Sequence, residues 1–200
     1  MWSRALNRSL YPSSSSGSRC SEGDTVPKDG PSRRYEVRST FRAPLSYVFR
    51  WCTHYTSKDG QYSGEGYQRR ILSRSGRRVT FEDLFDTKQG WIWVHRTVRL
   101  QPPDRWHADS VGSDRILSVD YRLSSLPGDR TRLLIVARRR PYGIGQANPP
   151  ITEWQRRVAG NWERLGRVLE RDYFRGHTDR KGRRGPGKPP RRRPPRTRDR

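Results

Sequence analysis

The chain has 200 residues, of which 30% are hydrophobic, and its 43 lysine and arginine residues outnumber 20 acidic residues to give a net charge of +23. This composition predicts one folded domain that is shorter than the chain, and it favours partners that carry phosphate or carboxylate groups. No apolar run approaches the about 18 residues that a membrane-spanning helix needs, so the sequence excludes a transmembrane segment.

The two ends of the chain are too polar to form a core. Residues 1–33 consist mainly of Ser, Gly, Pro and charged residues without periodicity, which predicts a disordered leader. Residues 175–200 carry 12 bases, two acids and several prolines, which predicts a disordered basic tail. The domain is therefore expected at residues 34–174.

Between these ends, the elements follow one another at regular intervals. Tyr35, Val37 and Phe41 share one parity, which predicts a strand. Pro44 then opens a short helix, and a polar segment follows it. Residues 66–140 contain six segments in which apolar and polar residues alternate, and turn residues separate these segments. This pattern is typical of an antiparallel meander.

The longest helix signal follows the last strand, in Asn148–Phe174. Its apolar residues recur at every third or fourth position: Ile151, Trp154, Val158, Trp162, Leu165, Leu169 and Tyr173. A single helix covers one face of a sheet, so this stripe is expected to pack on the sheet. Because the stripe is bulky, we expect it to hold the helix away from the sheet and to leave room for a ligand.

The segment "YEVRSTFRAPLSYVFRWCTHYTSKDG" (Tyr35–Gly60) resembles the first strand and helix of the START/Bet v 1-like helix-grip superfamily (SRPBCC). Together with the element order, the resemblance covers Arg34–Phe174, and the polyketide cyclase/dehydrase-like branch is the most similar. It implies an α+β helix-grip fold, with a seven-stranded antiparallel sheet wrapped around a long C-terminal helix. The superfamily includes ligand carriers, cyclases and regulators, so the resemblance leaves the function open.

A two-residue turn at Lys88-Gln89 would set the register of two neighbouring strands. It pairs Phe81 with Arg96 and Asp83 with Val94, and it places all four on the inner face. One interpretation makes Asp83 and Arg96 a structural buried ion pair. In the other, they line a pocket, where Asp83 acts as a general acid or base and Arg96 polarises a carbonyl group.

Other aromatic residues fall on both faces of the predicted sheet. Tyr121 is expected to point inward, either with its hydroxyl in the cavity or as a core residue whose hydroxyl is satisfied at the edge. Trp91, Trp93 and His95 fall on the outer face, where a loop, a tail or a second subunit would have to cover the tryptophans. A homodimer is therefore one prediction, and His95 is expected to be a surface residue.

Cysteine and histidine patterns indicate neither a metal site nor a cofactor. Cys20 and Cys52 lie far apart and the four histidines are scattered, which favours a reducing compartment such as the cytoplasm. Residues 1–20 are rich in arginine and serine and lack acids, so an organelle transit peptide is the alternative.

Three functions remain open on the sequence alone. The leading one is binding of a small hydrophobic or aromatic ligand, lipid-like or polyketide-like, between the sheet and the last helix. The second is a cyclase or dehydratase reaction with Asp83 and Arg96 as catalytic residues. The third is weak binding of nucleic acid or an anionic surface by residues 175–200. The alternative interpretation of this segment is a solvated tail without a partner. The predicted ligand-binding residues are Phe81, Val94, Tyr121, Trp154, Val158 and Trp162.

Overall fold

The computed structural model describes residues 31–63, 66–87, 90–141 and 147–182, with the side chains of the last six residues left out. The predicted leader lies outside this range except for its last three residues, and the predicted tail lies outside it except for its first eight. The turn predicted at Lys88-Gln89 also falls outside the described residues.

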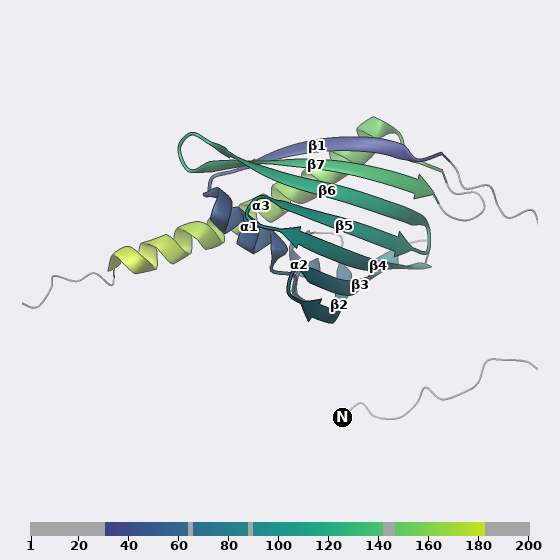
Figure 1. Cartoon of the computed structure of the whole chain (residues 1–200), viewed down its shortest axis with the longest axis horizontal. Coiled ribbons are helices and arrows are strands. Elements are labelled where there is room, and N and C mark those ends of the chain that lie inside the picture. Colours follow the sequence, from purple (N-terminus) through teal and green to yellow (C-terminus); the bar gives the residue numbers. More distant parts are fainter. Residues whose placement is uncertain (1–30, 64–65, 88–89, 142–146, 183–200) are drawn as a thin grey trace, which may run out of the picture.

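Seven antiparallel strands form one sheet, as the sequence predicted (Figure 1). Consecutive strands from the second to the seventh are neighbours, and the first strand pairs with the seventh. Across the sheet, the order is β1-β7-β6-β5-β4-β3-β2. The strands are β1 (Arg33–Phe41), β2 (Tyr67–Ser75), β3 (Arg78–Thr87), β4 (Gly90–Gln101), β5 (Arg105–Gly112), β6 (Arg115–Leu126) and β7 (Arg130–Pro141).

The predicted register of β3 and β4 is confirmed. Phe81 lies opposite Arg96, and Asp83 lies opposite Val94. Directly opposed residues share a face of the sheet, and the side chains of Phe81, Asp83 and Val94 are buried as expected on the inner face. On the outer face, Trp91 is 58% exposed, in agreement with the predicted alternation.

Three helices accompany the sheet: α1 (Leu45–Thr53), α2 (Gly60–Ser63) and α3 (Ile151–Gly182). The short helix α2 lies within the segment predicted as a polar break. Helix α3 continues past Phe174, where its apolar periodicity ends, into the segment predicted as a tail. The residues that follow include arginine and lysine, which are good helix formers, and the first proline comes at Pro186.

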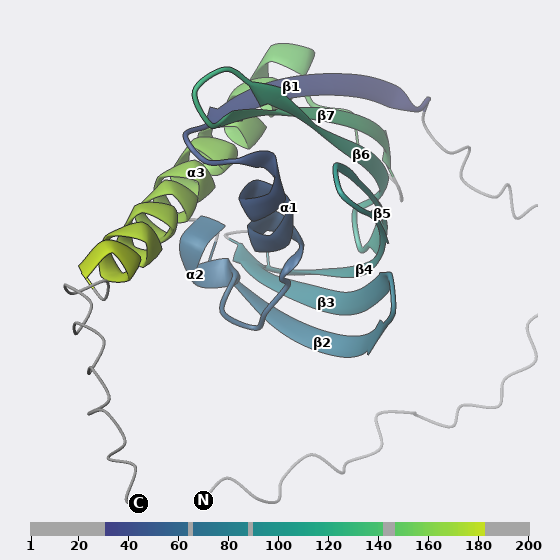
Figure 2. The ribbon, with the colours of Figure 1, turned by 60° about the vertical axis from the view of Figure 1, so that its left-hand side comes forward.

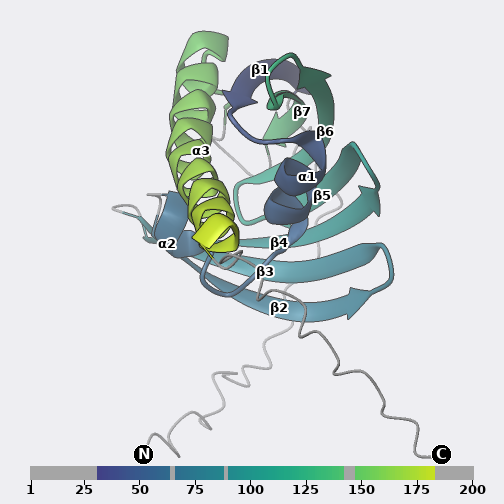
Figure 3. The same ribbon diagram turned by 90° about the vertical axis from the view of Figure 1, so that its left-hand side faces the viewer.

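The sheet curls around α1, and α3 lies along the open side of the curl (Figures 2 and 3). The first turns of α3 pack on β1 through Trp154, whose ring centroid is 4.5 Å from that of Tyr35. Further along α3, the rings of Trp162 and Phe41 are 6.3 Å apart. The aromatic stripe therefore packs on the sheet, although Ile151 at its start is 47% exposed.

The apolar core lines the inner face of the sheet from β1 to β3, and α1 and α3 contribute to it. Its buried side chains come from all the layers and include Tyr35, Phe41, Val48, Val119, Leu123, Leu133, Ile135, Trp154 and Leu169. Side chains of α1, α3 and the sheet leave a cavity beside this core.

Candidate ligand cavity

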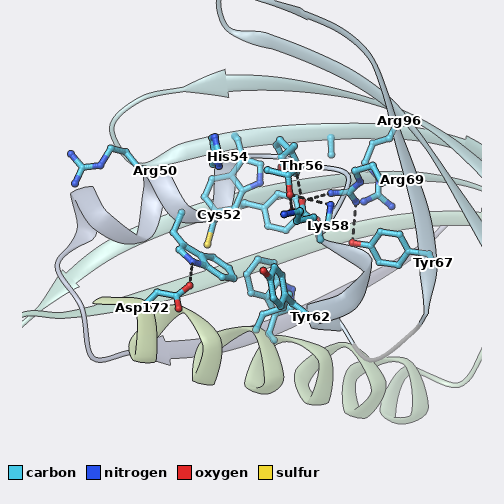
Figure 4. Close-up of a pocket in the computed structure, with 18 of the residues that line it drawn as sticks. Arg50, Cys52, His54, Thr56, Lys58, Tyr62, Tyr67, Arg69, Arg96 and Asp172 are labelled. Carbon is cyan, nitrogen blue, oxygen red and sulfur yellow. Dashed lines mark hydrogen bonds and ion pairs between the residues drawn. The ribbon is translucent and has the colours of Figure 1, made fainter. Parts of the chain in front are cut away.

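A cavity of about 550 Å³ lies between α1, α3 and the inner face of the sheet (Figure 4). Strands β2, β4, β5 and β6 contribute its floor, and the segment between α1 and α2 contributes one side. The lining residues are Tyr47, Arg50, Trp51, Cys52, His54, Tyr55, Thr56, Lys58, Asp59, Tyr62, Tyr67, Arg69, Arg96, Trp106, Ala108, Tyr121, Trp162, Leu165 and Asp172.

One wall of the cavity is aromatic. Trp106 of β5 and Tyr121 of β6 are directly opposed in the sheet, and their rings stack with centroids 4.7 Å apart and planes 6° apart. Trp162 projects from α3 and lies 6.0 Å from Tyr121. Stacked and tilted rings at these distances attract one another through their quadrupoles. Together, the three rings form a wall suited to a flat apolar molecule.

The opposite end of the cavity contains a buried ion pair. Arg69 donates from Nε to Asp83 Oδ1 at 2.7 Å and from Nη2 to Asp83 Oδ2 at 2.9 Å. The two side chains are 4% and 1% exposed. Arg69 Nη1 also donates to Asp59 Oδ2 at 2.6 Å, so the guanidinium joins β2, β3 and the segment before α2.

Arg69 remains charged despite its burial. Its carbon Cζ lies 4.0 Å from the centroid of the Phe81 ring, in cation–π contact. Burial alone lowers the pKa of Arg69, but the hydrogen bond and the charge of Asp83 outweigh it, and the net shift is upward. The pair therefore acts as a permanent brace at this end of the cavity.

A β-bulge in β2 brings a second arginine to the same side. The pairing of β2 with β3 shifts by one residue between Ile71 and Ser73. Arg69 and Arg74 are five residues apart and would face opposite sides of a regular strand, but the bulge gives both an inward-facing partner on β3. Arg74 Nη2 donates to the backbone oxygen of Tyr55 at 2.6 Å. Both arginines thus hold the segment 55–59 beside the cavity.

Arg96 lies on the inner face of β4 and has spare hydrogen-bond donors. Its Nε donates to Ser110 Oγ at 2.9 Å, and its Nη1 lies 3.9 Å from Asp83 Oδ2, beyond hydrogen-bonding distance. Its side chain is 22% exposed. Within residues 31–182, as far as they are described, its Nη groups make no hydrogen bond and are available to a ligand.

The remaining polar groups inside the cavity are uncharged at neutral pH. Burial raises the pKa of the Cys52 thiol and of the Tyr55 and Tyr121 hydroxyls. It also raises the pKa of Tyr67 to about 12, although Arg69 beside it acts in the opposite direction. These groups therefore serve as weakly polar hydrogen-bonding positions and not as nucleophiles.

Exposed side chains surround the opening of the cavity. Arg50, His54, Lys58 and Tyr62 are exposed there, and Figure 4 shows them around the ends of α1 and α2. Asp172 of α3 accepts a hydrogen bond from Trp51 Nε1 at 3.3 Å, which links α3 to α1 across the opening.

The predicted site residues separate into two groups. Arg96, Tyr121 and Trp162 line the cavity. Asp83 lies behind Arg69 and does not line it, and the Phe81 ring lies beneath the two guanidinium groups. The other three side chains lie away from the cavity surface, either buried or packed against the core: Val94, Trp154 and Val158.

Sequence reasoning missed several residues that shape the cavity. Arg69 shares the parity of Tyr67 and Ile71, so alternation in β2 could have placed it inward. The same rule applies to Trp106 and Ala108 in β5. Tyr55 carried no signal, because it lies in an irregular polar segment.

Among the described residues, no group of three or more His, Cys, Asp or Glu side chains is placed to hold a metal ion. The same residues include no helix that is long and apolar enough to cross a membrane.

No protein-family model and no curated protein matches this chain. Several solved structures, however, are similar to it in fold. A START superfamily protein from Mycobacterium smegmatis is 14% identical, with a TM-score of 0.53 over 68% of this chain and 94% of that one. A major latex-like protein from Panax ginseng is 5% identical, with a TM-score of 0.56 over 70% and 99%. The chain has the helix-grip fold. An aromatase/cyclase from Streptomyces sp. R1128 shares this helix-grip fold at 16% identity, with a TM-score of 0.51 over 78% and 99%.

The fold implied by the sequence resemblance is thereby confirmed. At identities this low, the likeness describes the helix-grip fold alone, since one fold serves carriers and enzymes alike.

Proposed function

We propose that the protein binds a small hydrophobic or aromatic molecule in the cavity between the sheet and α3. The observation that carries this proposal is a cavity of about 550 Å³ with the stacked pair Trp106 and Tyr121 in its wall and Trp162 beside Tyr121. Small-molecule sites are concave, largely apolar and equipped with a few polar groups that fix orientation.

The wall and the polar groups have separate roles in this proposal. A planar ligand lies against Tyr121 and Trp162, which are partly exposed, and aromatic stacking contributes about 0.5–1.5 kcal/mol beyond the burial of area. Trp106 is only 2% exposed and supports the Tyr121 ring from behind. The Nη groups of Arg96 donate to an oxygen of the ligand, and this contact sets its orientation. The ion pair of Arg69 and Asp83 fixes the segment 55–59 through Asp59, and Tyr55 of this segment lines the cavity.

The geometry supports binding over acid–base catalysis by Asp83. A general acid or base must reach the reacting group within hydrogen-bonding distance. Asp83 does not line the cavity, and both of its oxygens accept hydrogen bonds from Arg69. Arg96 meets the requirement of contact with a ligand, so we assign it an orienting role.

Binding of the uncharged fluorescent probe N-phenylnaphthylamine tests the proposal, because an uncharged probe is not attracted by the chain's positive charge. Ala108 is buried on β5 and lines the cavity, so Ala108→Phe fills it and should abolish the fluorescence increase. Val111→Phe is the matched control, since Val111 lies on the same strand, faces outward and is 49% exposed.

A second variant keeps the test decisive if Ala108→Phe does not fold. Tyr121→Leu removes one stacked ring without adding volume and should weaken probe binding about ten-fold, or about 1.4 kcal/mol. Native mass spectrometry of protein purified from its source should show a bound small molecule. Equal probe binding by the wild type and both variants would rule out the cavity as the site.

A further inference from the structure

The outer face of the sheet carries two neighbouring rows of polar residues across β4, β5 and β6. Arg99, His107 and Asp120 are directly opposed in the first row. Gln101, Arg105 and Arg122 are directly opposed in the second. A hollow of about 280 Å³ lies over these rows and is lined by Arg99, Gln101, Arg105, Trp106, His107, Asp120, Tyr121 and Arg122.

The carboxylates near the first row are fully engaged. His107 contacts Asp120 through Nδ1 and Asp109 through Nε2, each at 2.8 Å. Asp109 also pairs with Arg99, and Asp120 lies 3.9 Å from Arg138. Positive and negative side chains alternate along the network, in the order Arg99, Asp109, His107, Asp120 and Arg138. Each carboxylate therefore already has two cationic partners and cannot neutralise the arginines of the second row.

The second row holds two arginines that face each other. Arg105 and Arg122 are direct cross-strand partners, and like charges in this position destabilise a sheet. The carboxylate nearest to Arg105 is that of its neighbour Asp104, at 3.7 Å. Arg122 makes no ion pair with any described residue. Two guanidinium groups therefore border the hollow with little compensating charge.

We propose that this hollow binds a phosphate group between Arg105 and Arg122. Guanidinium forks match the geometry of phosphate oxygens, and a dianion would convert the repulsion between the two arginines into attraction to a shared ligand. Arg99 and the Gln101 amide add donors at the rim. The site faces away from the ligand cavity, so the proposal does not depend on what the cavity binds.

Thermal unfolding of the full chain in phosphate and in chloride at matched ionic strength tests the proposal. The wild type should show a higher Tm in phosphate than in chloride. Arg122→Gln should lose this difference, and in chloride its Tm should be at least that of the wild type, because the repulsion is removed. Arg70→Gln is the control, since Arg70 is exposed on the distant strand β2 and should keep the wild-type difference.

Isothermal titration with inorganic phosphate gives the direct measurement. The double variant Arg105→Gln/Arg122→Gln should bind at least about ten-fold more weakly than the wild type. Equal Kd values for the two proteins, or a wild-type Tm that is the same in phosphate and chloride, would overturn the proposal.

A parallel experiment separates free phosphate from phosphate on a lipid. Vesicles of phosphatidylcholine with phosphatidic acid are sedimented with the wild type and with Arg122→Gln. If Arg122→Gln reduces co-sedimentation, the site accepts a lipid phosphate. If co-sedimentation is unchanged while the variant no longer binds inorganic phosphate, the site takes soluble phosphate compounds.

Discussion

Arg69 connects three parts of the protein through one guanidinium group. It binds both oxygens of Asp83 on β3 and one oxygen of Asp59 next to α2. Because Arg69 and Asp83 are both buried, neither can exchange its partner for bulk water. Removing either partner would leave the other charge buried and without that partner, which would destabilise the folded protein.

We expect Asp83→Asn to lower the free energy of unfolding by about 3–5 kcal/mol, since it leaves a buried guanidinium with one carboxylate partner removed. Urea titration measures the change. Glu82→Gln is the matched control, because Glu82 is the preceding residue and its side chain is 45% exposed, and it should change stability by less than about 0.5 kcal/mol. A similar loss in both variants would contradict a structural role for the pair.

His107 is the residue that should make stability depend on pH near neutrality. Burial lowers its pKa, but hydrogen bonds to Asp120 and Asp109 outweigh this effect and raise it above the ordinary value of 6.5. The folded state thus holds its proton more tightly than the unfolded state. Its contribution to stability is full below about pH 6.5 and is lost as pH rises through the raised pKa.

Urea unfolding of the wild type and of His107→Gln from about pH 5 to about pH 9 checks this expectation. The stability difference between the two proteins should be largest at the acidic end and should shrink towards the basic end. Asp109 titrates below this range, because the hydrogen bond from His107 overcomes burial and lowers its pKa. A difference that grows with pH would show that His107 is neutral in the folded protein.

At the scale of residues, alternation predicted which face a side chain occupies but not which partner it binds. Asp83 and Arg96 lie on the inner face, as the register required. The partner that hydrogen-bonds Asp83 is Arg69, and its position depends on the bulge between Ile71 and Ser73. A bulge is an insertion of one residue in the pairing, and alternation within one strand does not reveal it.

At the scale of elements, α3 approaches β1 closely at one glycine. A Cβ atom at Gly166 would lie 3.1 Å from the Phe41 ring, whereas a Cβ atom at Gly160 would meet nothing closer than the flexible end of Arg164, at 3.9 Å. Both glycines lie inside the same helix, so they share the same low helix propensity and differ in their surroundings.

This contrast gives opposite expectations for two substitutions. Gly160→Ala should stabilise the protein by about 0.5–1 kcal/mol, because alanine favours the helix and has space. Gly166→Leu should destabilise it by about 1–3 kcal/mol, because the added atoms must displace Phe41. Thermal and urea unfolding measure both. Stabilisation by Gly166→Leu would show that α3 does not lie this close to β1.

The elements themselves were largely predictable, and their ends were not. Alternation and turn residues identified the seven strands, and the apolar spacing identified α1 and α3. Helix α2 was missed because four residues, Gly60–Ser63, are too few to show a periodicity. The C-terminal end of α3 was placed too early, because its last turns continue without an apolar stripe.

At the scale of the whole molecule, the seven-stranded sheet followed by a long C-terminal helix could be predicted from the element order and from the resemblance to the helix-grip superfamily. The expectation that the bulky stripe holds α3 away from the sheet was not met, because Trp154 and Leu169 are buried in the core. The composition of the cavity wall could not be predicted, because it combines side chains from seven helices and strands and from the segment between α1 and α2. Trp106 and Tyr121 also line the outer hollow, so a single layer of backbone separates the two proposed sites.

The bulge in β2 has a second effect, because β2 is an edge of the sheet. A long regular edge strand presents unpaired backbone groups to which another molecule can add its own strand, and this is a common route to aggregation. The bulge at Leu72 interrupts that ladder, and the exposed Arg70 and Arg74 charge its surroundings.

Deleting Leu72 should regularise the edge and increase self-association on mild heating, as measured by light scattering. A substitution such as Leu72→Ser, which keeps the bulge, is the control and should remain dispersed. The irregularity that positions two arginines beside the cavity would then also keep neighbouring copies of the protein from joining their sheets.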